Sequence, residues 1–198
     1  MTPVEILYSK VVEAVEENGL ALGHASYEMR KDKEIVMAAV KQHGCALQYA
    51  SHRLRSNKKV VMTAVAQNAR AYEYAAGSTK GNRQVVIAAV KHIGCLLNHA
   101  PLHCKNDIRI VIAAVAQNGD ALRYASEDMR NKKAVAIVAV AQNGTALRYA
   151  SRAIMNDKRV VMTAVKQDGR ALEYASDNLK KNEQIVMAAV TQHGDALA

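Results

Sequence analysis

The sequence has no Phe, no Trp and only two Pro among its 198 residues, and it has only three Cys. Three cysteines are an odd number and too few for a disulfide scaffold, which favours a reducing compartment. No run of about 18 apolar residues is present, which excludes a membrane-spanning helix. The start, MTPVEILYSK, lacks the charged and apolar pattern of a secretory signal. We therefore expect a cytoplasmic protein.

What the sequence does contain is repetition. A short segment ending in Gly recurs every 25 residues without insertion or deletion, for example as VKQHG, VKHIG and VAQNG. The chain divides into repeats over residues 7–31, 32–56, 57–81, 82–106, 107–131, 132–156 and 157–181, a partial repeat over 182–198, and a capping helix over 2–18. Such repeats bury their apolar faces only by stacking on one another. We expect one helical-repeat domain over residues 1–198.

Each repeat predicts two helices. In the repeat 157–181, Asp157 stands where an N-cap belongs, and Gly169 follows the last apolar residue of the first helix, the usual place for a left-handed C-cap. The apolar residues of a shorter second helix lie at Ala171, Leu172, Ala175 and Leu179. The predicted fold class is all-α, an α-solenoid of about eight two-helix repeats and about fifteen helices. Because the chain stops partway into a second helix, we expect the array to continue or to dock on another chain.

The recurring AVxQNGxALxYAS, followed by LRxDKxVV, resembles a family of tandem helical repeats of unknown function. Proteins of that family include effectors of intracellular bacterial pathogens, so the resemblance implies a repeat fold and a protein delivered into a host cell. It covers essentially the whole chain and supplies no catalytic motif. A looser similarity is to the repeats of transcription-activator-like effectors, in which a VVxxA helix also leads into a Gly turn. Those units are longer, and this chain lacks their paired specificity residues.

Positive charge concentrates where one repeat passes into the next, within a formal net charge of +9. The candidate binding residues at these junctions are Lys33, Lys58, Lys59, Arg83, Arg109, Lys132, Lys133, Lys158 and Arg159. Positive charge at a helix N-terminus opposes the helix dipole by up to about 1 kcal/mol, so a bound polyanion would favour it. The alternative is a solvated edge that aids solubility.

The residues beside the turn Gly vary while the frame stays constant, which is how repeat proteins grade specificity along a surface. The variable turn positions are His43, Arg70, Asp120, Asp168 and Arg170. The alternative is that exposed turns tolerate any residue.

Two series of side chains recur beside the turns, one of aromatic rings and one of glutamines. We expect the aromatic rings to lie half-buried between repeats; the alternative is that nucleic-acid bases stack on them. This aromatic ladder consists of His24, Tyr49, Tyr74, His99, Tyr124, Tyr149 and Tyr174. The glutamines predict a structural hydrogen-bond ladder, formed by Gln42, Gln67, Gln117, Gln142, Gln167 and Gln192.

Catalytic chemistry has little support. Cys95 and His99 lie four residues apart, a spacing that fits a soft metal, but Pro101 would break a helix before the next candidate ligand, His103. Ordinary substitution in the repeat accounts for His99 equally well. No nucleophile and base recur together. We expect no enzyme, no metal and no cofactor.

Two functions from different classes remain. One is a non-enzymatic scaffold that binds a protein partner on a smooth strip of the first helices, at Ala38, Thr63, Ala88, Ala113 and Thr163. The other is binding of nucleic acid or another polyanion through the basic junctions. The oligomeric state is left open.

Overall fold

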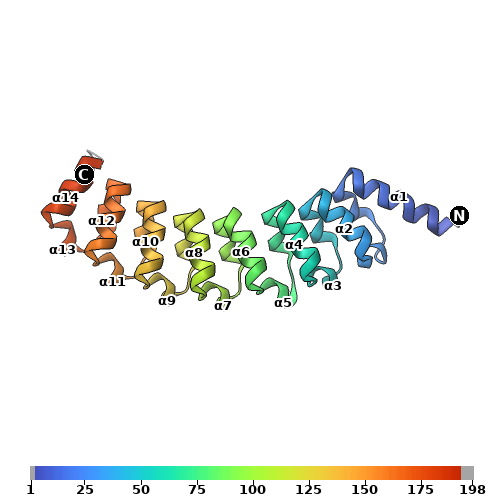
Figure 1. Cartoon of the computed structure of the whole chain (residues 1–198), viewed down its shortest axis with the longest axis horizontal. Helices are drawn as coiled ribbons and strands as arrows, with labels where there is room; N and C mark the ends of the chain where they lie inside the picture. Colours follow the sequence, from blue (N-terminus) through green and yellow to red (C-terminus); the bar gives the residue numbers. More distant parts are fainter. Residues whose placement is uncertain (1–2, 193–198) are drawn as a thin grey trace. The chain divides into compact units, whose positions relative to one another are not determined.

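The structure, a computed structural model, describes residues 3–192, with side chains from Leu7 onward. Every regular element in this range is helical (Figure 1). The first helix begins at Pro3, and proline is favoured at the first position of a helix. Thr2, the first residue of the predicted capping helix 2–18, and Gly194, the Gly of the last turn, lie outside the described residues.

Each repeat contains three helical segments, not the two that the sequence predicts. The long α-helices are α1 Pro3–Glu17, α2 Lys33–Gln42, α4 Lys58–Gln67, α6 Arg83–His92, α8 Ile108–Gln117, α10 Lys133–Gln142, α12 Lys158–Gln167 and α14 Glu183–Gln192. The 3-10 helices that follow them are η1 Gly19–His24, η3 Gly44–Tyr49, η4 Ala69–Tyr74, η5 Gly94–His99, η6 Gly119–Tyr124, η7 Gly144–Tyr149 and η8 Gly169–Tyr174. The short closing helices are η2 Met29–Lys31, α3 His52–Arg55, α5 Gly77–Lys80, α7 Leu102–Lys105, α9 Glu127–Arg130, α11 Arg152–Met155 and α13 Asp177–Lys180. The expected number of about fifteen helices is therefore too low.

The N-terminal ends of the long helices are capped as predicted. The Asp157 carboxylate accepts hydrogen bonds from the backbone N–H groups of Arg159 and Val160, at 3.0 and 3.1 Å. The same role is taken in other repeats by Asp32, Asn57, Asn82, Asp107 and Asn182. At α10 the position is occupied by Lys132, whose side chain makes no capping hydrogen bond.

The prediction of a left-handed Gly cap is wrong. The only positive φ in the described chain is at Gly77, so the turn glycines have ordinary backbone angles. They are needed for close approach: a Cβ added at Gly119 would lie under 3.0 Å from the carbonyl oxygen of Ala139 in the next repeat. Gly19, Gly44, Gly94 and Gly144 meet the equivalent oxygen in the same way. Each turn Gly therefore brings two successive repeats together.

The predicted glutamine ladder is confirmed and lies at this close approach. The backbone N–H of a turn Gly donates to Oε1 of the Gln in the next repeat, at 2.5–2.8 Å. The pairs are Gly19 with Gln42, Gly44 with Gln67, Gly94 with Gln117, Gly119 with Gln142, and Gly144 with Gln167. The same Gln side chains also reach back: Gln67 Nε2 donates to the Gln42 carbonyl oxygen. One amide thus satisfies two backbone groups of the preceding repeat.

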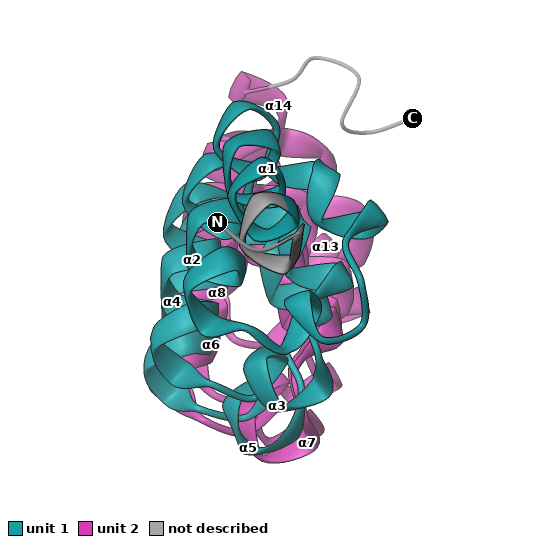
Figure 2. Ribbon diagram, turned by 90° about the vertical axis from the view of Figure 1, so that its right-hand side faces the viewer, with its two compact units in different colours: residues 1–92 teal, residues 93–198 magenta. Residues whose placement is uncertain are grey.

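The chain divides into two compact units, Met1–His92 and Ile93–Ala198 (Figure 2). In unit 1, α2 packs between α1 and α4, and α4 also packs on α6. In unit 2, α10 packs between α8 and α12, and α12 also packs on α14. Within each unit the long helices lie side by side and the short helices line one edge (Figure 1). The fold class is an all-α repeat solenoid, as predicted.

The core is built from small apolar side chains on both sides of each long helix. In α2, Ile35, Val36, Ala39 and Val40 have no exposed surface, and the same four positions are buried in α4 through α12. An α-helix presents residues i, i+1, i+4 and i+5 over a wide arc, so α2 and α4 in unit 1 and α10 and α12 in unit 2 are each covered by two neighbouring long helices. Frequent alanine lets the helices approach closely without Phe or Trp. No helix within residues 3–192 combines the length and apolar character needed to cross a bilayer.

Candidate functional site

The nine candidate basic residues all lie at the N-terminal ends of long helices, and all are exposed. Unit 1 holds Lys33, Lys58, Lys59 and Arg83, on α2, α4 and α6. Unit 2 holds Arg109, Lys132, Lys133, Lys158 and Arg159, on and just before α8, α10 and α12. Their repeat position places them on one edge of each unit, which is the arrangement the junction pattern predicts. Their role in binding stays a prediction.

Side chains of adjacent first turns reach one another. Lys58 Nζ donates to Gln84 Oε1 at 2.5 Å, and Lys158 Nζ donates to Gln184 Oε1 at 2.8 Å. Lys133 forms an ion pair of 2.6 Å with the capping carboxylate of Asp157. This hydrogen bond from Lys133, together with the backbone donors, holds the pKa of Asp157 below its ordinary value.

Four other basic residues near the junctions are partly buried. Lys80, on short helix α5, donates from Nζ to the carbonyl oxygens of Tyr72 and Glu73 at 3.4 and 2.6 Å, and burial lowers its pKa. Arg30, Arg55 and Arg130 are half-buried, with Nε enclosed. The basic character of the junctions is therefore displayed to solvent mainly by the first turns of the long helices.

The turn positions carry more structural bonds than their variability suggests. Asn18, Asn68, Asn118, Asn143 and Asp168 each cap the following 3-10 helix by accepting a hydrogen bond from the N–H two residues ahead. Asp120 accepts a hydrogen bond from Asn143 Nδ2 at 3.0 Å and pairs with Arg148 at 3.2 Å. The preference for Asn and Asp before the Gly was the sequence signal for these caps.

The other predicted turn residues differ in exposure. Asp168 pairs with Arg170 within the same turn, at 2.7 Å, and Arg170 is exposed. Arg70 is also exposed, whereas His43 is half-buried and its Nδ1 is enclosed without a hydrogen bond. No catalytic set is formed by these residues, and their proposed recognition role stays a prediction.

The aromatic ladder is half-buried at its five tyrosines, as predicted, but His24 and His99 are exposed, which corrects the expectation for those two. A histidine ring is smaller than a tyrosine ring and leaves the end of its 3-10 helix less covered.

Unit 2 adds a feature that the sequence pattern did not reveal. The guanidinium groups of Arg123 and Arg148 lie 4.5 and 4.6 Å from the ring centroids of Tyr124 and Tyr149. Hydrogen bonds to Tyr149 and Tyr124 raise the pKa of Arg123. Each arginine stacks on the tyrosine next to it in the same repeat, and the hydrogen bond between Arg123 and Tyr149 joins neighbouring repeats. The signal was an Arg directly before the Tyr in two successive repeats.

The candidate metal ligands are not gathered into a site. Cys95 Sγ accepts a hydrogen bond from Asn118 Nδ2 at 3.3 Å, and His99 is exposed at the end of η5. Among the described residues, no three His, Cys, Asp or Glu side chains are close enough to share a metal ion.

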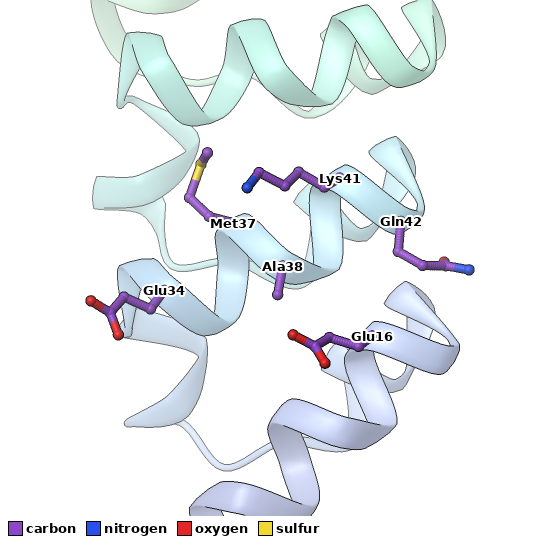
Figure 3. A pocket seen from close by; sticks show the side chains of 6 residues that line it. All are labelled: Glu16, Glu34, Met37, Ala38, Lys41 and Gln42. Carbon is purple, nitrogen blue, oxygen red and sulfur yellow. The ribbon is translucent and has the colours of Figure 1, made fainter.

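The outer face of the long helices, turned away from the buried residues, is open and partly apolar. In unit 1 it carries a hollow of about 560 Å³ bordered by Glu16 of α1 and by Glu34, Met37, Ala38, Lys41 and Gln42 of α2 (Figure 3). Glu16 points into the space between the two helices, and Met37 and Lys41 project on the side of α2 away from α1 (Figure 3). Ala38, Thr63, Ala88, Ala113 and Thr163 are half-buried on this face, where the predicted strip of small groups lies.

Comparison with known families agrees with the tandem architecture. A family model described as Domain of unknown function (DUF4116) matches six overlapping stretches of the chain. These are residues 10–55, 32–77, 82–130, 110–155, 133–180 and 157–198. Neither the curated proteins nor the solved structures gave a match.

Proposed function

The chain belongs to the family described as Domain of unknown function (DUF4116), and we propose that it acts as a non-enzymatic scaffold that binds a protein partner. The observation that carries this proposal is the outer face of the long helices. Small and apolar side chains lie there half-exposed, repeat after repeat, next to exposed charges. Such a mixed surface suits recognition of another protein better than it suits chemistry on a small molecule.

The polar residues that chemistry would need have structural partners. Asp157 caps α12 and pairs with Lys133, and Asp120 is bonded to Asn143 and Arg148. The residues that line the hollow in unit 1 include no nucleophile beside a base. These observations support a binding role over a catalytic one.

Photo-crosslinking from the full chain tests the scaffold. A photoreactive amino acid at Ala113, on the outer face of α8, is expected to capture one or a few defined proteins from lysate. The matched control places it at Ala153, which is exposed on short helix α11, and is expected not to capture the same proteins. Absence of any position-dependent capture would overturn the proposal.

The resemblance to effector-borne repeats supports the cytoplasm of a host cell as the place of action. The crosslinking is therefore run in parallel in eukaryotic and bacterial lysates. Capture confined to the eukaryotic lysate is the expected result, and capture confined to the bacterial lysate would contradict the effector assignment while leaving the scaffold intact.

The alternative function is polyanion binding, favoured by the exposed basic first turns. Charge reversal at Lys58, Lys59, Lys132, Lys133, Lys158 and Arg159 should abolish binding of a fluorescent oligonucleotide in an anisotropy titration. Reversal of the exposed short-helix residues Arg53 and Arg152 is the control. With a double-stranded oligonucleotide, the logarithm of the wild-type association constant should fall linearly with the logarithm of the salt concentration, with a slope of about −0.9 per phosphate contacted. No binding at low salt, or equal loss in both variants, would refute this alternative.

A further inference from the structure

The outer face of α8 and α10 in unit 2 is apolar to an unusual degree. Ile108 is 39% exposed, and Ile112, Ile137 and Val138 are half-buried. Ala116 and Ala141 lie exposed near the C-terminal ends of the two helices, which pack side by side. These six residues are called the α8–α10 face below. Large β-branched side chains make this more than a strip of small groups.

Other repeats carry charge at the positions of Ile108, Ala116 and Ala141. Lys41, Lys91 and Lys166 occupy the repeat position of Ala116 and Ala141. The position of Ile108 holds Lys33, Lys58 and Arg83 in unit 1. Because the repeat folds equally with lysine at these positions, packing within the chain does not require apolar residues there.

Helix α10 shows the consequence most clearly. Its inner side buries Val135, Ala136, Ala139 and Val140 completely. Its outer side carries Ala134 and three members of the α8–α10 face, so α10 is apolar all round between its end residues Lys133 and Gln142. A helix of that kind is normally covered on every side, and among the described residues of unit 2 the elements that pack on α10 are α8, α9, α12, η6 and η7, all of which lie away from its outer side.

Positive charge borders the face at its N-terminal end. Arg109 on α8 and Arg159 on α12 are exposed, and Lys158 is exposed with its Nζ on a glutamine. The carboxylates nearest in sequence to Arg109 and Arg159 already have partners within the chain. Asp107 caps α8, and Asp157 caps α12 and forms an ion pair with Lys133. A partner that covers the apolar residues would therefore meet cations at one end, which acidic side chains would complement.

A helix fits this surface better than an extended strand. The backbone groups of α8 and α10 are taken up within the helices, so an extended segment would find no backbone partners, whereas a helix satisfies its own. Each long helix has ten residues, about 15 Å, and neighbouring axes lie about 8–10 Å apart. Those dimensions match about three turns of a docked helix.

From these observations we infer that the α8–α10 face binds an amphipathic α-helix of a partner protein, with an apolar stripe on Ile112, Ile137 and Val138 and acidic residues toward Arg109 and Arg159. This inference rests on the proposed scaffold function and specifies its partner class. A second copy of the chain is a different occupant, which the experiment below detects.

The probe is a synthetic fluorescent peptide of about 14 residues, with leucine on one helical stripe and glutamate on both flanks, titrated against the full chain by anisotropy. A matched peptide carries lysine in place of glutamate. The test variant A116K/A141K introduces the lysines that Lys91 and Lys166 place natively at this repeat position. The control variant A66K makes the same change at the same repeat position in unit 1.

The glutamate peptide is expected to bind the wild type and A66K equally, and A116K/A141K about tenfold or more weakly. R109Q/R159Q should weaken the glutamate peptide and remove its preference over the lysine peptide. The inference is overturned by no binding, by equal binding to A116K/A141K, or by equal binding of the lysine peptide. Concentration-dependent self-association lost in A116K/A141K would assign the face to a second copy and also overturn it.

Failure of this inference is distinct from failure of the scaffold. If the peptide does not bind but Ala113 still crosslinks to a defined protein, only the partner class is wrong. If crosslinking also fails, the scaffold is wrong. Far-ultraviolet circular dichroism checks that A116K/A141K remains helical.

Discussion

Substituting Gly119 by alanine should destabilise unit 2 substantially. The new Cβ would lie under 3.0 Å from the Ala139 carbonyl oxygen and 3.0 Å from both the Asn143 Cβ and the Gln142 Oε1. A backbone oxygen cannot rotate away, so η6 and α10 must separate, which costs about 1–3 kcal/mol as overpacking. Separation also weakens the Gly119–Gln142 hydrogen bond, worth about 0.5–1.5 kcal/mol. Alanine returns about 0.4–1 kcal/mol by restricting the unfolded chain, which leaves a net loss of about 2 kcal/mol.

Urea unfolding of the full chain, with native-state hydrogen exchange at the α10 amides, measures this loss. Exchange is needed because repeat arrays do not always unfold as one cooperative unit. The control is Gly81→Ala: φ there is −100°, and the same repeat position holds Ser56 and Asn106, so little change is expected. A Gly119→Ala variant within about 0.5 kcal/mol of wild type would refute the close-approach argument.

The chain itself supplies a compensating pair for this perturbation. Ala69 replaces the turn Gly in unit 1, and His92 replaces the Gln that would contact it. Copying the pair as G119A/Q142H should therefore destabilise less than the sum of the two single variants, with a coupling of about 1 kcal/mol. Strict additivity would show that the two positions do not act on one contact.

Two further predictions concern the long-helix N-termini. Lys132→Asn should stabilise α10 by about 1 kcal/mol, because Asn57 caps α4 from the same repeat position. Thermal unfolding measures this gain in stability, with Lys132→Ala as the control. An equal gain from alanine would contradict the capping role. Lys133→Gln should make the protein unfold at higher pH during acid titration. Since Lys133 and backbone donors depress the folded pKa of Asp157, its stabilisation is present above the unfolded pKa of about 3.9 and is lost as pH falls through the folded pKa. Lys158→Gln removes the same charge without a carboxylate partner and should leave the titration midpoint nearer to wild type; equal shifts would contradict the role of the ion pair.

Much of the architecture was predictable because the repeat imposes one environment on every copy. Asp157 and its equivalents predicted the caps, and the recurring glutamines predicted a ladder. The 3-10 helices were not predictable, because the apolar residues of a segment such as Gly119–Ala125 fit both the three-residue period of a 3-10 helix and the 3.6-residue period of an α-helix. Gly119, Leu122 and Ala125 lie three residues apart and are all buried, but Ala121 and Ala125 are equally consistent with an α-helical stripe.

The unpredicted Arg–Tyr contacts follow from the same ambiguity. In a 3-10 helix, three residues per turn set the direction in which Arg123 and Arg148 project. That direction decides whether each guanidinium stacks on the adjacent tyrosine, and whether Arg123 reaches Tyr149 in the next repeat. An α-helical reading places those side chains elsewhere. A cross-repeat contact therefore depended on a local geometry that the apolar pattern left undecided.

The bonding of the turns also changes where specificity is expected. The positions of Asp120 and Asp168 vary from repeat to repeat, yet both side chains have structural partners. Asp120 is bonded to Asn143 and Arg148 of the next repeat, and Asp168 caps its own turn and pairs with Arg170. On the outer face, exchange of Lys91 for Ala116 and Ala141 alters no bond that holds the repeats together, because the Gly–Gln ladder and the buried Val and Ala set their spacing. Variation that packing does not constrain is free to follow a partner. The loss of charge from two successive helices is therefore better explained by recognition on the outer face than by recognition at the turns.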